Sequence, residues 1–354
     1  MIPEFYETWH IAPKLLILVL FMVVGVFFLV KFCDIFVGAA SSVAKKLKIA
    51  PMIIGLTVVA MGTSCPELAV SVSDSISCLI EGNGAHANVA IGNVVGSNIC
   101  NILLVLGLSI IFTPIIIKKS TMKKEMPFLL GVSLLLVIFG IFFGIGTITG
   151  NYAILRWEGI IFIVLMIAYL VFLVIDAKRH PQEDSEEEIK DMPMWKAILF
   201  IVLGAVGIAA GGEFVVFGAK GLAVTGATAI GVDHDLAESL VGLTIVAVGT
   251  SLPELVTSTV AAKKGQNDIA LGNVIGSNIF NILFVLGIAA TVNPLTTGNE
   301  IVIDLIVMMS VTTLLFGLAF TGKLGKKTGI LFVSIYILYL TYLILRTLGV
   351  FPQM

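Results

Sequence analysis

Two separated parts of this chain are near copies of each other. Residues 54–71, IGLTVVAMGTSCPELAVS, align without gaps on residues 241–258, VGLTIVAVGTSLPELVTS. Residues 87–107, ANVAIGNVVGSNICNILLVLG, match residues 267–287, NDIALGNVIGSNIFNILFVLG, in the same way. Because the two halves of a duplicated chain are expected to fold into the same unit, this repeat constrains the architecture more than any other feature.

The copies lie in a strongly apolar chain. Of its 354 residues, 58% are hydrophobic and only 12% are charged, whereas a soluble domain carries about 25% charged residues. One helical membrane crossing needs about 20 apolar residues. Apolar runs bounded by charge, Pro or Gly predict ten such helices, over residues 12–44, 51–80, 86–112, 125–146, 153–176, 194–224, 236–262, 267–292, 300–321 and 328–348. The expected fold class is an all-α polytopic membrane protein.

A polar segment, PQEDSEEEIKD at residues 181–191, separates the fifth predicted helix from the sixth. Its composition is that of a solvated tether. We therefore expect a first five-helix repeat over residues 1–176, an acidic linker over 177–193 and a second five-helix repeat over 194–354. Because five is odd, the second copy enters the membrane from the opposite face. Such inverted-topology repeats are typical of secondary transporters, whose substrate site lies near the midplane where the repeats meet.

Positive charge predicts the orientation of the chain. If the loops alternate between the two faces, most Lys and Arg residues fall on one face, and the other face holds only Lys14, Arg156, Lys220 and Arg346. Short cytoplasmic loops accumulate positive charge. We therefore expect a multi-pass protein of the cell membrane, with both termini outside and the acidic linker in the cytoplasm.

The motif GTS-x-PE falls inside an apolar helix in each repeat, at residues 62–67 and 249–254. The proline has no backbone N–H, so it frees the carbonyl four residues back, that of Gly62 or Gly249. A free carbonyl in hydrocarbon needs a partner. A cation, a water molecule and a neighbouring hydroxyl group are all candidates.

The motif also places a carboxylate, Glu67 or Glu254, within the membrane. An ionisable residue at the bilayer centre costs at least about 2.5 kcal/mol and is interpreted as functional by default. Thr63 and Thr250 lie one helical turn earlier on the same face. The four repeated segments contain no Lys or Arg as a counter-ion, so a buried ion pair is disfavoured. A protonated Glu bonded to a neighbouring helix is the structural alternative.

The second pair of repeated segments supplies a polar stripe. Residues spaced by four lie on one helix face, and here these are Asn93, Ser97 and Asn101 in the first copy and Asn273, Ser277 and Asn281 in the second. Glycines spaced by four allow close helix packing, as at Gly92 with Gly96 and at Gly272 with Gly276. Asn98 and Asn278 lie off the stripe and are expected to make helix contacts.

Together the segments offer carboxylate, hydroxyl, amide and carbonyl oxygens. Ca²⁺ takes about 6 to 8 such oxygens, whereas zinc and copper prefer imidazole or thiolate. The set therefore favours a hard cation. Two carboxylates can be neutralised by one divalent ion or by two monovalent ions, so competition for shared ligands would couple opposite fluxes. We expect no resident cofactor, no nucleophile–base pair of an enzyme and, at a net charge of −2, no nucleic-acid surface.

GTSCPE with GSNICN, repeated as GTSLPE with GSNIFN, resembles the repeats of the calcium:cation antiporter superfamily, in particular its prokaryotic sodium/calcium exchangers. The resemblance implies Ca²⁺ and Na⁺ as transported ions and long first and sixth helices that slide against a static core. It also implies ion ligands at Glu67, Thr63, Ser97 and Asn101 with Glu254, Thr250, Ser277 and Asn281, and second-tier ligands at Ser64 and Ser251. Some relatives carry Asp where this chain has Asn281, so this site has one titratable group fewer.

Other functions use the same residues. Antiport of another cation pair, H⁺/Ca²⁺ or Na⁺/Mg²⁺, or a K⁺-dependent exchange would need the same cage. A cation channel is a further alternative, but inverted repeats favour alternating access. We expect the chain to be embedded in a lipid bilayer. Nothing in the sequence sets its oligomeric state.

Overall fold

The computed structural model describes residues 11–81, 88–143, 152–180, 192–229, 247–297, 299–348 and 350. Each of the ten predicted segments contains helix within these residues. The seventh segment is described only from Ala247 onward. The predicted acidic linker lies outside the described residues over 181–191.

The first five segments contain one long helix, three interrupted helices and another uninterrupted one. They are α1 (Ile11–Leu47); α2 (Pro51–Ile54), η2 (Gly55–Val59), α3 (Ala60–Thr63) and α4 (Cys65–Glu81); α5 (Asn88–Cys100), η3 (Asn101–Leu106) and α6 (Gly107–Phe112); α7 (Lys119–Lys123), α8 (Glu125–Ile138) and η4 (Phe139–Phe143); and α9 (Arg156–Arg179). The elements labelled η are π-helical.

The second five segments repeat this order. They are α10 (Met194–Ala229); α12 (Ala247–Thr250) and α13 (Leu252–Lys263); α14 (Asn267–Phe280), η6 (Asn281–Leu286) and α15 (Gly287–Val292); α16 (Asn299–Ala319); and α17 (Lys326–Thr347). Eight helices, or nine if the bent pair Pro51–Thr63 and Cys65–Ile80 is one span, are long and apolar enough to cross a membrane within the described residues.

The third and eighth segments form the centre of the molecule. Buried residues make up 78% of the most apolar window of Val89–Phe112 and 83% of that of Asn267–Val292, against 44% or less in the other single spans. A large apolar cluster surrounds them and includes buried residues of α8, α9, α16 and α17. Polar side chains on α5 and α14 therefore lie as far from lipid as this fold allows.

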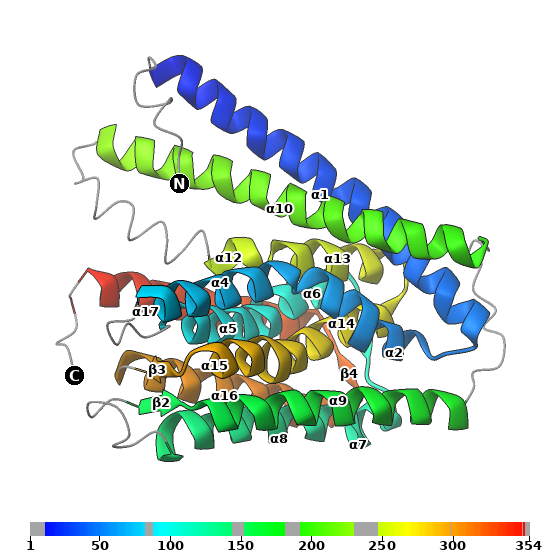
Figure 1. The fold of residues 1–354 in the computed structure, drawn as a ribbon. Helices are drawn as coiled ribbons and strands as arrows, with labels where there is room; N and C mark the ends of the chain where they lie inside the picture. The colour runs from blue at the N-terminus through cyan, green and yellow to red at the C-terminus, as the bar shows by residue number, and fades with distance from the viewer. Residues whose placement is uncertain are drawn as a thin grey trace.

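α1 and α10 pack along each other and form an outer layer across one side of this centre (Figure 1). Their lipid-facing surface is apolar, with Leu16, Val23 and Val206 more than half exposed. On its inner side, the layer formed by α1 and α10 contacts α13 and the start of the second segment. The two longest helices are thus joined mainly to each other.

Four short strands, which the sequence does not predict, connect the two repeats. β1 (Ile115–Ile116) pairs antiparallel with β4 (Lys323–Leu324), and β2 (Tyr152–Ile154) pairs antiparallel with β3 (Leu295–Thr297). In each pair one strand follows the third or eighth segment and the other precedes the tenth or fifth. The two pairs therefore exchange places when one repeat is superposed on the other, as expected for an inverted repeat.

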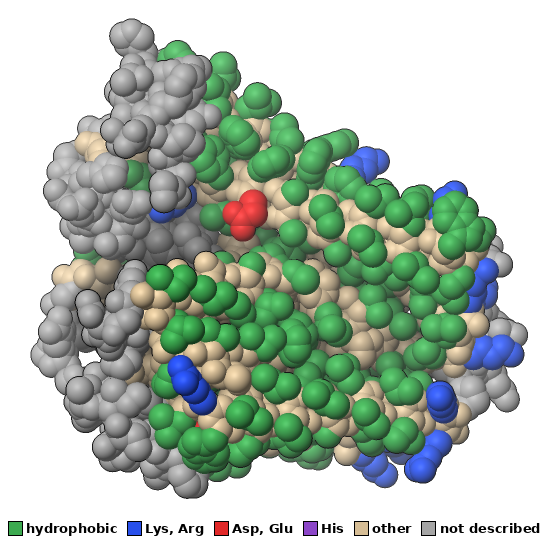
Figure 2. Space-filling model, in the orientation of Figure 1, with side chains coloured by type: hydrophobic (Ala, Val, Ile, Leu, Met, Phe, Trp, Pro, Cys, Tyr) green, Lys and Arg blue, Asp and Glu red, His purple; other side chains and the backbone are tan. Residues whose placement is uncertain are grey.

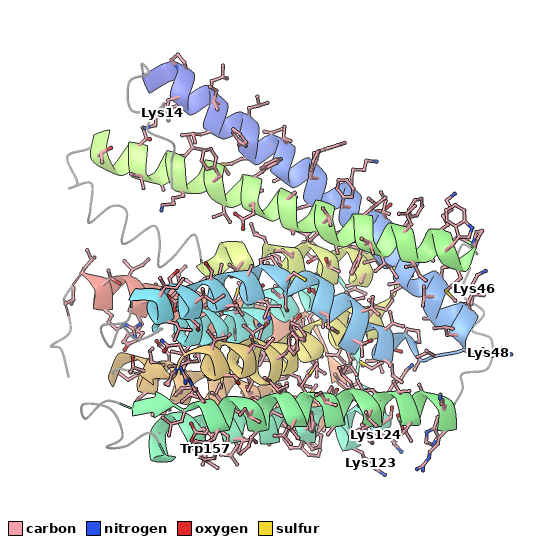
Figure 3. The ribbon with its side chains drawn as sticks, in the orientation of Figure 1. Lys14, Lys46, Lys48, Lys123, Lys124 and Trp157 are labelled. Carbon is pink, nitrogen blue, oxygen red and sulfur yellow. The ribbon has the colours of Figure 1, made fainter. Side chains whose placement is uncertain are left out.

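The surface is that of a membrane protein. Figure 2 shows hydrophobic side chains over the long sides of the molecule and most of the Lys and Arg side chains of this face at one end. Lys46, Lys48, Lys123 and Lys124 lie at that end, and Lys14 and Trp157 lie toward the opposite end (Figure 3). The basic residues thus cluster as the loop count predicts.

Close packing at the centre requires glycine on α14. A Cβ atom added at Gly276 would lie 2.7 Å from both the Cα atom and the carbonyl oxygen of Leu56, and one at Gly272 would lie 2.7 Å from the carbonyl oxygen of Met52. These contacts are to backbone, which cannot rotate away. The predicted role in close helix packing is confirmed for Gly272 and Gly276. It is wrong for Gly92 and Gly96, where an added Cβ would meet nothing within 4 Å.

Gly276→Ala is therefore expected to lower the free energy of unfolding by about 1–3 kcal/mol, the usual cost of overpacking. The matched control is Gly131→Ala on α8, where an added Cβ meets nothing within 4 Å. Thermal unfolding of the purified proteins in detergent measures both. Equal midpoints for Gly276→Ala and the wild type would contradict the packing described here.

Candidate functional site

Both copies of the GTS-x-PE motif break their helix at the serine. Ser64 separates α3 from α4 with φ −87° and ψ 10°, and Ser251 separates α12 from α13 with φ −85° and ψ 3°. In the first repeat the two parts of the segment are bent by 49°. The missing N–H of Pro66 and Pro253 removes one helical hydrogen bond at this point and explains the break.

The break places each carboxylate at a helix start. Glu67 lies in the first turn of α4 and Glu254 in the first turn of α13. Both side chains are fully buried. The N-terminal end of a helix carries partial positive charge, which stabilises a nearby carboxylate. The local fold therefore offsets part of the cost of placing negative charge in the membrane interior.

Hydroxyl groups of the opposite repeat reach each carboxylate. Ser64 donates a hydrogen bond to Oε1 of Glu254 at 2.7 Å, and Ser277 donates to the same oxygen at 3.4 Å. Since Ser64 lies three residues before Glu67 in the same motif, this bond brings the two motifs together.

Related but not identical contacts occur around the other carboxylate. Ser97 donates to Oε1 of Glu67 at 3.2 Å, and Ser251 donates to the hydroxyl oxygen of Ser97 at 3.4 Å. Thr250 lies beside Glu67, as Thr63 lies beside Glu254. Both carboxylates thus belong to one cluster built from the two repeats.

Four asparagines extend the cluster across the same interface. Asn98 and Asn278 each donate to the other's backbone carbonyl at 3.3 Å. Asn101 donates to Oδ1 of Asn278 at 3.1 Å, and Asn281 donates to Oδ1 of Asn98 at 3.3 Å. The helix contacts predicted for Asn98 and Asn278 are confirmed, and these contacts commit the amide nitrogens of Asn101 and Asn281.

The cluster also contains buried side-chain oxygens that accept no hydrogen bond, and these are its most informative feature. Within the described part of the chain, buried side-chain oxygens without a hydrogen-bond partner include Oε2 of Glu67, Oε2 of Glu254, Oδ1 of Asn101 and Oδ1 of Asn281. Leaving a buried polar atom unpaired costs about 1–3 kcal/mol, and more when the group is charged. Four such atoms at repeat-related positions indicate a place for a ligand that accepts electron pairs.

The two motif glycines lie at the edge of the cluster, under the outer layer. A Cβ atom on Gly62 would lie 2.9 Å from the ring of Phe36 on α1, and one on Gly249 would lie 2.2 Å from Val216 on α10. Gly249 is buried and Gly62 is partly exposed. The outer layer therefore rests directly on both helix breaks.

Sequence reasoning left out two serines that support the cluster, Ser71 and Ser258, which bind the predicted stripe residues Asn93 and Asn273. Asn273 accepts a hydrogen bond from Thr63 at 3.1 Å and donates to Ser258 at 2.9 Å. In the first repeat, Asn93 donates to Ser71 at 3.1 Å. The signal was present, because both serines occupy the same repeat position four residues after the glutamate and so lie one helical turn beyond it.

The site offers oxygen atoms as ligands. Among the described residues, no group of three or more His, Cys, Asp or Glu side chains is placed to hold a metal ion. Carboxylate, amide and hydroxyl oxygens without imidazole or thiolate suit Ca²⁺, Mg²⁺ or monovalent cations better than zinc or copper.

Comparison with known proteins agrees with this chemistry. The sodium/calcium exchanger protein family matches residues 17–175 and 196–345. The chain is 39% identical over 319 residues to the putative antiporter CaxA of Alkalimonas amylolytica, covering 88% of this chain and 92% of that protein. It is 31% identical over 356 residues to the sodium/calcium exchanger MaX1 of Methanosarcina acetivorans, covering 92% and 97% of the two chains.

Solved structures show the same fold. The sodium-calcium exchanger NCX_Mj, soaked with Na⁺ and Sr²⁺, superposes with a TM-score of 0.74 at 32% sequence identity, covering 92% of this chain and 98% of that one. With a family match in both repeats and relatives that span nearly the whole length, the chain belongs to the sodium/calcium exchanger protein family.

Proposed function

We propose that this protein is a secondary active antiporter that exchanges Ca²⁺ for Na⁺ across the membrane through one cation site shared by the two repeats. The observation that carries the proposal is the set of four unpaired, buried oxygens on Glu67, Glu254, Asn101 and Asn281. A cation is the ligand that can pair with all four at once, since each is a lone-pair donor.

The proposed ligands follow the repeat. The carboxylates supply the charge, and neutral oxygens complete the coordination: Glu67, Thr63, Ser64, Ser97, Asn101 and the Gly62 carbonyl from the first repeat, with Glu254, Thr250, Ser251, Ser277, Asn281 and the Gly249 carbonyl from the second. One Ca²⁺ neutralises two carboxylates, and so do two Na⁺ ions. Shared ligands therefore make binding of the two kinds of ion competitive, which couples their fluxes.

The relatives support this choice of ions. MaX1 and NCX_Mj are named as sodium/calcium exchangers. H⁺/Ca²⁺, Na⁺/Mg²⁺ or K⁺-dependent exchange would use the same carboxylates, and a channel would need continuous access to them. In the proposed mechanism the α1–α10 layer moves over the helix breaks at Gly62 and Gly249 and exposes the site to one face at a time. Ca²⁺ and Na⁺ are cargo, and no resident cofactor is required.

Flux in proteoliposomes separates these functions. We expect uptake of ⁴⁵Ca²⁺ only when an outward Na⁺ gradient is imposed. Replacing that gradient with a pH gradient tests H⁺/Ca²⁺ exchange, adding K⁺ on either side tests K⁺ dependence, and Mg²⁺ competition tests the divalent ion. Calcium uptake that ignores sodium would reject the proposal, and single-channel current steps would reassign the protein as a channel.

Glu67→Gln and Glu254→Gln are each expected to reduce Na⁺-driven calcium uptake by roughly 100-fold or more, because calcium affinity depends steeply on the charge of its ligands. Gln has nearly the same volume, so the proteins should still fold. The matched control is Glu158→Gln, a buried membrane carboxylate whose Oε2 caps α9 at 2.7 Å from the Leu155 nitrogen. Exchange at the wild-type rate in either site variant, with the control equally active, would remove the basis of the proposal.

Asn281→Asp adds a third carboxylate to the proposed cage. Since protons compete with Ca²⁺ for every carboxylate ligand, calcium uptake should fall more steeply as the pH is lowered than in the wild type. Asn101→Asp is the repeat-related counterpart and should steepen the profile in the same direction. Uptake measured across a pH series gives the comparison. Profiles that superpose on the wild type in both variants would place these side chains outside the ion's reach.

We also propose that both termini lie outside the cell and that the linker lies in the cytoplasm. In a variant without the four native cysteines, Cys introduced by Lys123→Cys should be protected from a membrane-impermeant maleimide in intact cells. Cys introduced by Arg156→Cys should react. Permeabilised cells, in which both should react, provide the control, and the reverse pattern would invert the topology.

A further inference from the structure

A second cavity lies away from the cation cluster, between one end of α8 and the second half of α9. Its volume is ≈ 310 Å³, and its lining includes Lys124, Glu125, Phe128, Tyr169 and Phe172. Lys124 marks the basic end of the molecule (Figure 3). The cavity therefore lies where these two membrane-spanning helices approach a membrane surface.

Two buried polar atoms in this cavity lack a partner. They are Oε2 of Glu125 and the hydroxyl group of Tyr169, on side chains of residues only 6% and 4% exposed. The Tyr169 ring is held by stacking on Phe128, with ring centres 4.3 Å apart and 7° between planes. The ammonium group of Lys124, the preceding residue in the chain, forms its ion pair with Asp176 at 2.5 Å and gives Oε2 of Glu125 no hydrogen bond.

The second repeat contains the same arrangement in a filled form. Residues 159–176 of α9, GIIFIVLMIAYLVFLVID, align without gaps on residues 329–346 of α17, GILFVSIYILYLTYLILR. Tyr169 therefore corresponds to Tyr339, Phe172 to Tyr342 and Asp176 to Arg346. Tyr339 and Arg346 of α17 reach α16, the repeat counterpart of α8, through Asp304.

There a cation completes the group. Tyr339 donates to Oδ1 of Asp304 on α16 at 3.0 Å, and the two terminal nitrogens of Arg346 each lie 3.1 Å from Oδ2 of Asp304. The same guanidinium lies over the ring of Tyr342, 5.5 Å from its centre. Acid, hydroxyl, aromatic face and cation thus form one satisfied unit.

The first repeat keeps the acid, the hydroxyl and the ring but has a carboxylate where the cation should be. A buried carboxylate oxygen without a donor, such as Oε2 of Glu125, is costly. The group that would satisfy the cavity has N–H donors for Glu125, an acceptor or donor for Tyr169, and a positive charge that can lie over Phe172. Such a ligand is a primary ammonium group.

We propose that this cavity binds the headgroup of a phospholipid with a primary ammonium group, of the ethanolamine type. Lipid is the favoured source, because the cavity lies on two membrane-spanning helices and Phe172 at its rim is 44% exposed. Lys124 lines the same cavity, and its ion pair with Asp176 leaves 32% of its side chain exposed, so a lipid phosphate at the membrane surface would share the ammonium group with Asp176. This binding site is independent of the cation site and of the ions exchanged.

Native mass spectrometry after lipid competition tests the proposal. The protein is placed in nanodiscs of phosphatidylcholine mixed with phosphatidylethanolamine, and the lipid that stays bound is counted. We expect ethanolamine lipid to be retained about tenfold better, the equivalent of one charge-assisted hydrogen bond, because the choline nitrogen has no N–H group. Equal retention of the two lipids would overturn the proposal.

Variants assign the preference to this cavity. Glu125→Gln and Tyr169→Phe should each reduce the preference for ethanolamine lipid, whereas the matched control Tyr339→Phe in the second repeat should keep it. Asp176→Arg should supply the cation from the chain itself, as Arg346 does in the second repeat, and remove the preference without unfolding the protein. A preference that persists in Glu125→Gln and Asp176→Arg would refute the assignment.

Free ethanolamine distinguishes the source of the ammonium group. If dissolved ethanolamine displaces the bound lipid at equal concentrations, the acyl chains contribute nothing and the lipid assignment is wrong. If it does not, the lipid is the ligand. Calcium flux in the same variants should be unchanged, so failure here and failure of the exchange proposal give different results.

Discussion

The interaction on which this structure depends is the burial of two carboxylates in the interior of a membrane protein. A group of this kind is stable only if helix ends, hydroxyl donors or ligands balance its charge. Here each glutamate begins a helix and accepts serine hydrogen bonds. The proline breaks provide the helix starts that stabilise these carboxylates. The central position of α5 and α14 keeps their polar side chains away from lipid.

Neither repeat can form the cluster alone. Ser64 of the first repeat serves Glu254 of the second, and Asn98 orients Asn281 while Asn278 orients Asn101. Without the other half, each repeat would lose these cross-repeat hydrogen bonds and keep only those within itself, such as Ser97 to Glu67 and Ser277 to Glu254. The complete cluster therefore exists only where the two repeats are packed against each other.

Much of this arrangement could be predicted from the sequence, because a gapless internal repeat carries information about both topology and site. The ten helical segments and the cross-repeat contacts of Asn98 and Asn278 were within reach of spacing arguments. The π-helical segments that begin at Asn101 and Asn281 were not, because one extra residue per turn leaves no local signal in an apolar run. The strands were missed because two or three residues of pairing depend on loops brought together only by the tertiary fold. That the clustered oxygens bind ions stays a prediction.

The strand pairs have a mechanical consequence. β1–β4 and β2–β3 each link a loop of one repeat to a loop of the other, and Figure 1 shows β4 and the β2–β3 pair toward different ends of the molecule. Because the two repeats are joined by strand pairs toward both ends, a rigid-body rotation of one repeat away from the other would break backbone hydrogen bonds. α1 and α10 contribute no strand to either pair, so in the proposed mechanism they can slide along the core while the strand pairs stay intact.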